Sequence, residues 1–150
     1  LEDMLKQMDE TEGNEVEFGF IPATDDEISI QSKRKENTAA IGRSELDQSG
    51  LRWYGYGTTI PKLLLAQVGV SSSIGIVNRN GNATTKESDV KNAVATKKAV
   101  SVELGYDVKV VGSAYDTVIV ASTHTATIPL IGNFIAHTKD QYYISGGIVQ

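Results

Sequence analysis

Hydrophobic residues recur along this chain at two different spacings. At the start they follow the i, i+3, i+4, i+7 spacing that places side chains on one face of a helix. These residues are Leu1, Met4, Leu5 and Met8. From residue 15 the period becomes two, because Val16, Phe18 and Phe20 alternate with acidic or small residues. The chain is therefore expected to open with a short amphipathic helix and to continue as a strand.

The opening helix is expected to be the end of a longer one. Ten residues form only a marginal helix alone in water, and no capping residue precedes Leu1. Position 1 is Leu rather than Met, which fits the removal of an upstream segment. We interpret residues 1–12 as the soluble tail of a helix that anchors a parent protein in a membrane. A terminal helix that docks on the protein's own core is the alternative.

The next part of the chain predicts a strand, a loop and a helix. Ile28 and Ile30 alternate with polar residues, which predicts a second strand paired antiparallel with the first. Residues 32–50 are polar and contain Gly and Ser, which predicts a long surface loop. Residues 58–65 fit the start of a helix, with a proline in its first turn. A strand is the alternative there, because apolar residues alternate over 68–76.

A turn and a further helix follow. Asn80-Gly81 can adopt positive φ at low cost, which predicts a tight turn. Residues 87–99 predict a helix that Ser88 caps and whose last turn carries Lys97 and Lys98, as the helix dipole favours. Its expected stripe is Val90, Ala93, Val94 and Lys97.

The last fifty residues predict strands alone. The expected strands lie at residues 100–104, 108–110, 117–127, 128–135 (interrupted by Pro129 and Gly132) and 142–149. Strands that follow one another without helices indicate an antiparallel sheet. We therefore predict one soluble domain over residues 1–150 with an α+β fold. It would combine a mostly antiparallel sheet with a short N-terminal helix and one or two further short helices.

Composition limits the possible partners. Hydrophobic residues make up 40% of the 150 residues, and the longest apolar run, residues 63–66, is too short to cross a bilayer. The net charge of −5 is uneven, since residues 1–27 hold ten acidic residues and one basic residue. The basic clusters at 33–35 and 97–98 carry no interleaved aromatics. We expect no nucleic-acid partner, because such partners select a concentrated basic face.

Candidate chemistry is sparse. The chain has no cysteine, and its two histidines, His124 and His137, stand thirteen residues apart without a carboxylate at ligand spacing. We expect both to lie on strands and face water. The acidic triplet at residues 25–27 lacks the alternating oxygen ligands of a calcium loop, so a solvated turn is expected. No catalytic motif, metal site, cofactor or small-molecule substrate is identified.

The aromatic run is the main candidate for contacts. Trp53, Tyr54 and Tyr56 stand in one predicted strand segment, where aromatics usually pack in a core or at an edge. An exposed contact surface is the alternative.

The C-terminal third resembles a known family. Residues 117–122, the Pro-containing residues 127–132 and the final residues 143–149 give a strand, an apolar turn and a last strand. This order is similar to that of pilin-like proteins of the TadE-like type and of Gram-positive conjugative elements, in which it follows an N-terminal membrane helix. The resemblance covers about fifty residues and transfers no functional residue. It implies a subunit that packs with itself or with sister subunits.

Three functions remain as hypotheses. The first is a non-catalytic structural subunit of a cell-envelope or pilus-like assembly, extracytoplasmic or on the cell surface and held in the membrane by a missing N-terminal segment. Its protein contacts would be Leu1, Met4, Leu5, Met8, Trp53, Tyr54 and Tyr56. The second is a virion or tail structural protein. The third is a small enzyme or ligand-binding domain, for which the same aromatics and His124 are the candidates.

Overall fold

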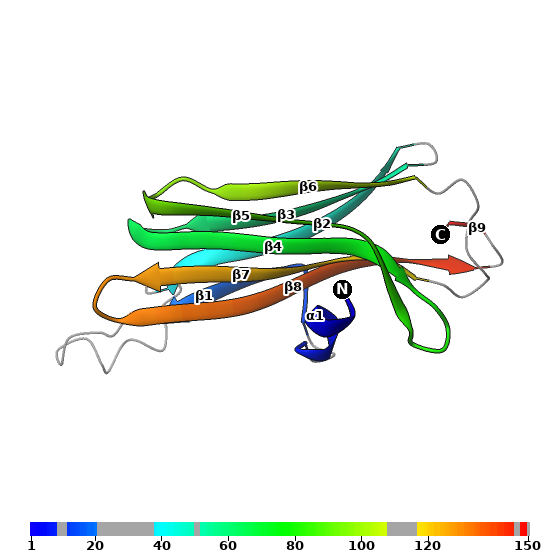
Figure 1. Ribbon diagram of the computed structural model, residues 1–150, viewed down its shortest axis with the longest axis horizontal. Helices are drawn as coiled ribbons and strands as arrows, with labels where there is room; N and C mark the ends of the chain where they lie inside the picture. The colour runs from blue at the N-terminus through cyan, green and yellow to red at the C-terminus, as the bar shows by residue number, and fades with distance from the viewer. Residues whose placement is uncertain (9–11, 21–37, 50–51, 108–116, 146–147, 150) are drawn as a thin grey trace.

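The computed structural model describes residues 1–8, 12–20, 38–49, 52–107, 117–145 and 148–149. They form one short helix and nine strands (Figure 1). The elements are α1 (Glu2–Lys6), β1 (Glu15–Phe20), β2 (Thr38–Ser49), β3 (Arg52–Pro61), β4 (Leu65–Val77), β5 (Ala83–Thr96), β6 (Val100–Asp107), β7 (Thr117–Ile128), β8 (Gly132–Ser145) and β9 (Ile148–Val149).

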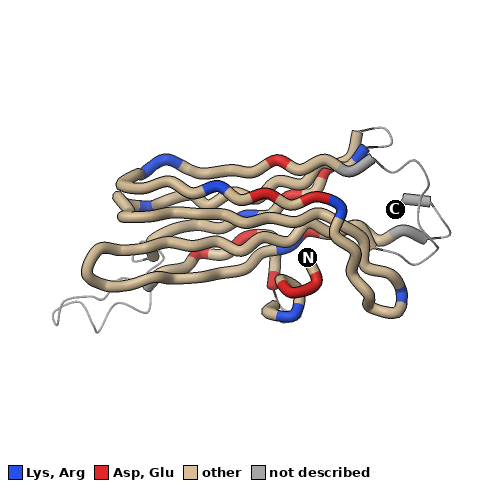
Figure 2. The backbone as a smooth tube through the Cα atoms, viewed as in Figure 1, with Lys and Arg blue, Asp and Glu red and all other residues tan. Residues whose placement is uncertain are grey.

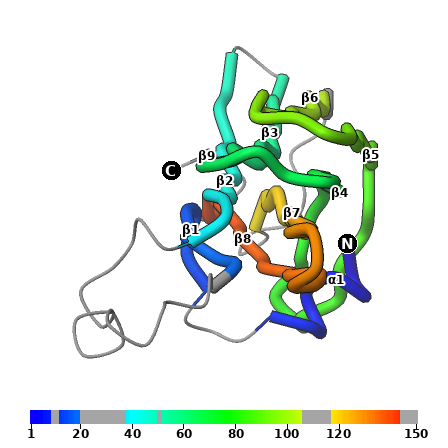
Figure 3. Tube along the Cα trace, turned by 90° about the vertical axis from the view of Figure 1, so that its left-hand side faces the viewer, coloured from blue at the N-terminus to red at the C-terminus, as the bar shows by residue number. Residues whose placement is uncertain are grey.

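The strands form two antiparallel sheets that face each other as a sandwich (Figures 1 and 3). One sheet has four strands in the order β1-β2-β3-β6, and the other has five in the order β5-β4-β7-β8-β9. The chain crosses from the first sheet to the second after β3, returns for β6, and crosses again to β7. The sheets therefore bury one face each, as the alternating patterns of β1 and β7 require.

The predicted α+β class is wrong. The helix expected over residues 87–99 is replaced by β5, which continues to Thr96, and the helix expected at 58–65 by the end of β3 and the start of β4. The strand alternative at 58–65 is confirmed at 58–61 and at 65, with a bend between the two strands. Within the described residues α1 is the only helix, and it has five residues. The loop expected over 32–50 is also wrong from Thr38 on, where β2 begins.

Other predictions of local structure are confirmed. The first strand is β1, the turn at Asn80-Gly81 joins β4 to β5 with Gly81 at φ 86°, and the strands predicted at 100–104 and 117–127 are β6 and β7. Asn78 stabilises the turn at Asn80-Gly81, since its Oδ1 accepts hydrogen bonds from the backbone N–H groups of Asn80 and Asn82. The strands predicted at 128–135 and 142–149 differ in their bounds, because residues 129–131 form a turn and β8 runs without a break from Gly132 to Ser145. The strands predicted at 28–30 and 108–110 lie outside the described residues.

Two apolar clusters fill the interior. The first contains Leu46, Trp53, Ile74, Leu104, Val118 and Val120, and the second contains Phe18, Ala39, Ala40, Leu65, Val68, Ala126 and Ile128. Both sheets contribute to each cluster, so burial of these side chains holds the sheets together. Along the strands, a set of buried polar residues stands between the two clusters.

The helix α1 packs on the protein's own sheet. It contacts β7 and β5, and the Leu1 side chain lies against Gly75 of β4. The four residues of the N-terminal stripe are all partly buried. Among the described helices, none is long and apolar enough to cross a membrane.

Candidate functional site

The aromatic run divides between the two faces of β3. Trp53 is 1% exposed and packs in the core, where its ring lies 5.5 Å from that of Tyr142. Tyr54 and Tyr56 are half-buried, and the burial pattern of β3 alternates along its whole length. Because Tyr54 is adjacent to Trp53 in a strand, it must point to the opposite face, and Tyr56 shares that face with it. Only the two tyrosines are available to a partner.

Acidic side chains surround the two tyrosines. Tyr56 is paired across the sheet with Glu45 of β2 and Glu103 of β6, and Tyr54 is paired with Asp47 of β2. Directly opposite side chains on a sheet have Cβ atoms only about 5 Å apart. We call the residues Glu45, Asp47, Tyr54, Tyr56 and Glu103 the tyrosine face.

A cation from the same chain lies on this face. The guanidinium of Arg52 is 5.3 Å from the centre of the Tyr54 ring, a cation–π distance. Its side chain also lies over Gly105, where a Cβ would collide with the guanidinium. Among the described residues, Glu45, Asp47 and Glu103 form no salt bridge. The two carboxylates paired with Tyr56 across the sheet therefore have no ion-pair partner in the described part of the chain.

These charges also act on the phenol of Tyr56. Burial, followed by the negative charges of Glu103 and Asp47, raises the pKa of Tyr56 above its usual 10.0. The hydroxyl therefore keeps its proton at all physiological pH values and can donate a hydrogen bond.

His124 lies in the interior, so the prediction that it faces water is wrong. It is fully buried, and its ring is 6.3 Å from that of Phe18. A Cβ on Gly42 would overlap the imidazole, so glycine at this position makes the room that the ring occupies. His137 is only partly buried, and its Nδ1 lies 3.1 Å from Thr123 Oγ1.

A continuous chain of hydrogen bonds runs through His124. Its Nδ1 lies 2.8 Å from Thr59 Oγ1, and its Nε2 lies 2.7 Å from Thr138 Oγ1. Thr59 donates to the carbonyl oxygen of Gly69 at 2.8 Å. The buried hydroxyls of the chain are Thr59, Thr138, Ser44, Ser122 and Ser72, with 2.7 Å between each consecutive pair from Thr138 to Ser72. We call this set the hydroxyl chain.

The directions of these bonds determine where the ring holds its proton. Thr59 gives its proton to Gly69, so the Nδ1 of His124 must donate to Thr59. In a neutral ring, Nε2 then accepts from Thr138. Ser44 donates to Ser122, which leaves the contact between Ser44 and Thr138 one proton short. A protonated ring would supply that proton.

Burial outweighs this gain. One additional internal hydrogen bond contributes about 1 kcal/mol, whereas an unpaired charge in the interior costs several kcal/mol. Accordingly, desolvation, with a smaller contribution from His137, lowers the pKa of His124 to about 4. The ring is therefore neutral at neutral pH. The hydroxyl chain links the two sheets by hydrogen bonds and carries no net charge.

The contact between histidine and hydroxyl groups does not form an accessible nucleophile. Ser or Thr activated by His is the arrangement of many hydrolases. Here Ser44, Ser122, Thr138 and His124 are each at most 2% exposed, so no substrate reaches them in this conformation. No three His, Asp or Glu side chains in the described ranges are grouped so that they could hold a metal ion.

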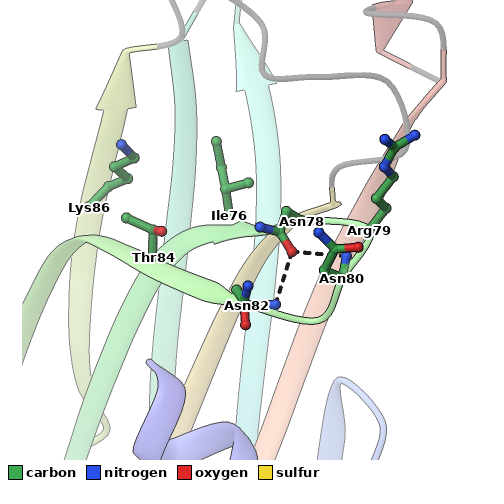
Figure 4. A pocket seen from close by; sticks show the side chains of 7 residues that line it. All are labelled: Ile76, Asn78, Arg79, Asn80, Asn82, Thr84 and Lys86. Carbon is green, nitrogen blue, oxygen red and sulfur yellow. Dashed lines mark hydrogen bonds between the residues drawn. The ribbon is translucent and has the colours of Figure 1, made fainter.

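A pocket lies beside the hairpin of β4 and β5 (Figure 4). Its volume is about 400 Å³, and its lining is Ile76, Asn78, Arg79, Asn80, Asn82, Thr84 and Lys86. The close-up shows that most of these side chains come from the turn and its flanking strand residues. Amides dominate the lining, and Arg79 and Lys86 are its two bases. Sequence reasoning placed most of these residues in a turn, noted a glycosylation sequon at residues 82–84, and assigned none of them a ligand.

Searches of protein-family models, of curated proteins and of solved structures find no significant match to the chain. Of the segments on which the pilin resemblance rests, residues 117–122 lie in β7, and residues 143–149 fall at the end of β8 and in β9, with 146–147 outside the described residues. Neither these strands nor the comparisons test the resemblance, so membership of that family stays a prediction.

Proposed function

We propose that the protein is a non-catalytic structural subunit of an extracytoplasmic or cell-surface assembly, and that it binds sister subunits through the tyrosine face. The observation that carries this proposal is the outward position of Tyr54 and Tyr56 on a sheet face with carboxylates at paired positions. Tyrosine is enriched in protein interfaces because it combines a large apolar ring with a hydrogen-bonding hydroxyl.

The partner's chemistry follows from the charges. Arg52 already places a guanidinium on the ring of Tyr54. On the same face, two residues further along β3, the ring of Tyr56 lies between the paired residues Glu45 and Glu103. An Arg or Lys side chain from a sister subunit would find the same ring contact there, with two carboxylates to neutralise it. The membrane anchor belongs to this proposal as the means by which the parent protein stays at the cell surface.

The four hydrophobic residues of the N-terminal stripe have a different place in this proposal. Leu1, Met4, Leu5 and Met8 are partly buried where α1 meets the five-stranded sheet. They are therefore the weaker candidates for contacts with another subunit. Trp53 is a core residue and takes no direct part.

A photo-crosslinking experiment in cells that express the full-length gene tests the proposal. A benzophenone amino acid replaces Tyr56, and in a matched control it replaces Asp89, an exposed residue of β5 on the other sheet. We expect position 56, but not position 89, to yield products that mass spectrometry identifies as this chain linked to itself or to another envelope subunit. Equal products at the two positions, or no product at position 56 in the envelope fraction, would contradict the proposal.

A further inference from the structure

The strand β8 leaves one edge of the five-stranded sheet unpaired. It pairs with β7 from Gly132 to Tyr143, whereas β9 covers its other edge only at Ile144 and Ser145. Figure 1 shows β8 along the lower border of this sheet. An unpaired edge presents backbone N–H and C=O groups that another strand can bind.

The alternation of backbone direction along the strand determines which N–H groups of β8 point away from β7. The N–H of Lys139 donates to Gly13 O at 2.9 Å, on the side away from β7. Alternate residues of a strand point their N–H groups to the same side, and the register with β7 is continuous. The N–H groups of Asn133, Ile135 and His137 therefore also point outward. In the described part of the chain, no backbone group pairs with them.

Three other strand edges are protected, whereas this one is not within the described part of the chain. The Leu46 N–H on β2 is bound by Asp140, and the Gly105 N–H on β6 is bound by Glu87. The edge strand β5 carries four charged residues and a register shift beside Gly75, both of which discourage pairing. By contrast, residues 130–138 contain no Asp, Glu, Lys or Arg, and the tip of this hairpin is uncoloured in Figure 2.

Several exposed side chains along this edge are apolar. Ile135 is 63% exposed on the outer face, and Leu130 and Ile131 at the hairpin tip are also exposed. An exposed, apolar and charge-free edge strand is the kind that pairs with another chain.

We propose that two copies of this chain associate by antiparallel pairing of β8 with β8 about a twofold axis at Ile135. The three outward N–H groups, at 133, 135 and 137, are symmetric about residue 135, and the free stretch ends at 139, where Gly13 occupies the edge. In this register Ile135 lies opposite the partner's Ile135, and Asn133 lies opposite the partner's His137. Each opposed pair exchanges two backbone hydrogen bonds.

The side chains agree with this register. The two Ile135 side chains share the outer face, so each covers exposed apolar surface of the other. No charged residue of the stretch meets another charge, and Lys139 lies opposite the partner's Ile131. A twofold axis at His137 would instead need the Lys139 N–H, which Gly13 already binds. The contact is independent of the tyrosine face, which is on the other sheet.

Cysteine cross-linking tests both the contact and its register. The chain has no cysteine, so a single introduced thiol reacts only between copies. Directly opposed residues have Cα atoms about 5.5 Å apart, within the range of a disulfide. We expect Ile135→Cys to form a disulfide-linked dimer under mild oxidation, while Asn133→Cys and the control Val94→Cys on β5 do not. The double variant Asn133→Cys with His137→Cys should cross-link again.

Sedimentation of the full chain tests the backbone bonds. Ile135→Pro removes an N–H that points away from β7, so the fold should persist with an unchanged circular dichroism spectrum. We expect the dimer dissociation constant to rise at least about tenfold. Ile135→Lys places a charge at the same edge and should also raise the dimer dissociation constant. Val94→Lys, on β5, is the control and should leave that constant unchanged.

Three results would overturn the proposal. The first is a wild-type chain that stays monomeric at about 0.5 mM, a concentration well above typical weak dimer dissociation constants. The second is equal cross-linking at positions 133 and 135. The third is a dimer that persists after both substitutions of Ile135. A dimer that instead dissociates on Glu103→Lys would place the contact on the tyrosine face, so the two proposals can fail separately.

Discussion

Acid should destabilise this protein through His124. The ring is neutral in the folded state because its pKa is lowered to about 4, whereas in the unfolded chain it should titrate near the usual 6.5. Between these values the unfolded state binds more protons than the folded state, so stability falls as pH falls. A difference of roughly 2.5 pKa units at about 1.4 kcal/mol each predicts a loss of about 3 kcal/mol by pH 4.

The measurement is urea unfolding at pH 7.5, 6.0, 5.0 and 4.0. Trp53 is the only tryptophan and is buried, so its fluorescence reports loss of the core. His124→Gln provides the control, because the amide can keep hydrogen bonds with the hydroxyl chain but does not titrate. The carboxylates titrate in both proteins, so only the difference between the two pH profiles counts.

The two profiles should diverge below pH 6.5 and stop diverging below about pH 4. The variant should be less stable at pH 7.5, since its amide fits the site less well, yet lose about 3 kcal/mol less on acidification. Parallel profiles over the whole range would refute the reasoning. They would mean that the pKa of His124 in the folded state is close to its value in the unfolded chain, as for a solvated ring.

Two further predictions concern the interior. Gly57→Ala should destabilise the fold by about 1–3 kcal/mol, because its Cβ would overlap Ser72 Oγ. Gly13→Ala is the control and should leave stability unchanged, since no atom lies within 4 Å of its Cβ. Thermal melting of both variants measures the difference. Ser122→Ala should cost about 1–3 kcal/mol in urea unfolding because it leaves Ser44 and Ser72 without a shared partner. A loss below about 0.5 kcal/mol for Ser122→Ala would mean that the hydroxyl chain is dispensable.

The sequence predicts some of these strands well and others poorly for an identifiable reason. β7 is rich in β-branched residues, and β1 has Val16 and Phe18 at alternate positions, so the sequence predicts a strand at both places. The inward positions of β2 include Gly42 and Ser44, which the hydroxyl chain and His124 require. A polar interior erased the alternation there, and residues 38–49 were therefore predicted to be loop.

The same cause explains the error on His124. A histidine between Thr123 and Thr125 has the sequence surroundings of a solvated strand residue. The two buried hydroxyls that its ring contacts, on Thr59 and Thr138, belong to other strands. The error on residues 87–99 has another cause. Nearly all of β5 is exposed, so its apolar residues show no strand period, and pairing with β4 overrides the weak helical pattern.

The tyrosine face was only half predictable. Adjacent aromatics in one strand must divide between core and surface, but which of Trp53 and Tyr54 turns inward depends on the register with β2 and β6. The acidic neighbours come from those two strands, and one of them, β2, was not recognised as a strand. The free edge of β8 depends on strand order, which no local pattern contains.

The close fit of Gly57 against Ser72 and Ser122 also limits the order in which these positions can be substituted during evolution. A side chain at position 57 is less costly once Ser72 has lost its hydroxyl, because the new Cβ would otherwise overlap Ser72 Oγ. Substitution of Ser72 in turn removes a hydrogen bond from Ser122. The order of the two substitutions therefore matters, and related chains should show these positions changing together, with the serine replaced first.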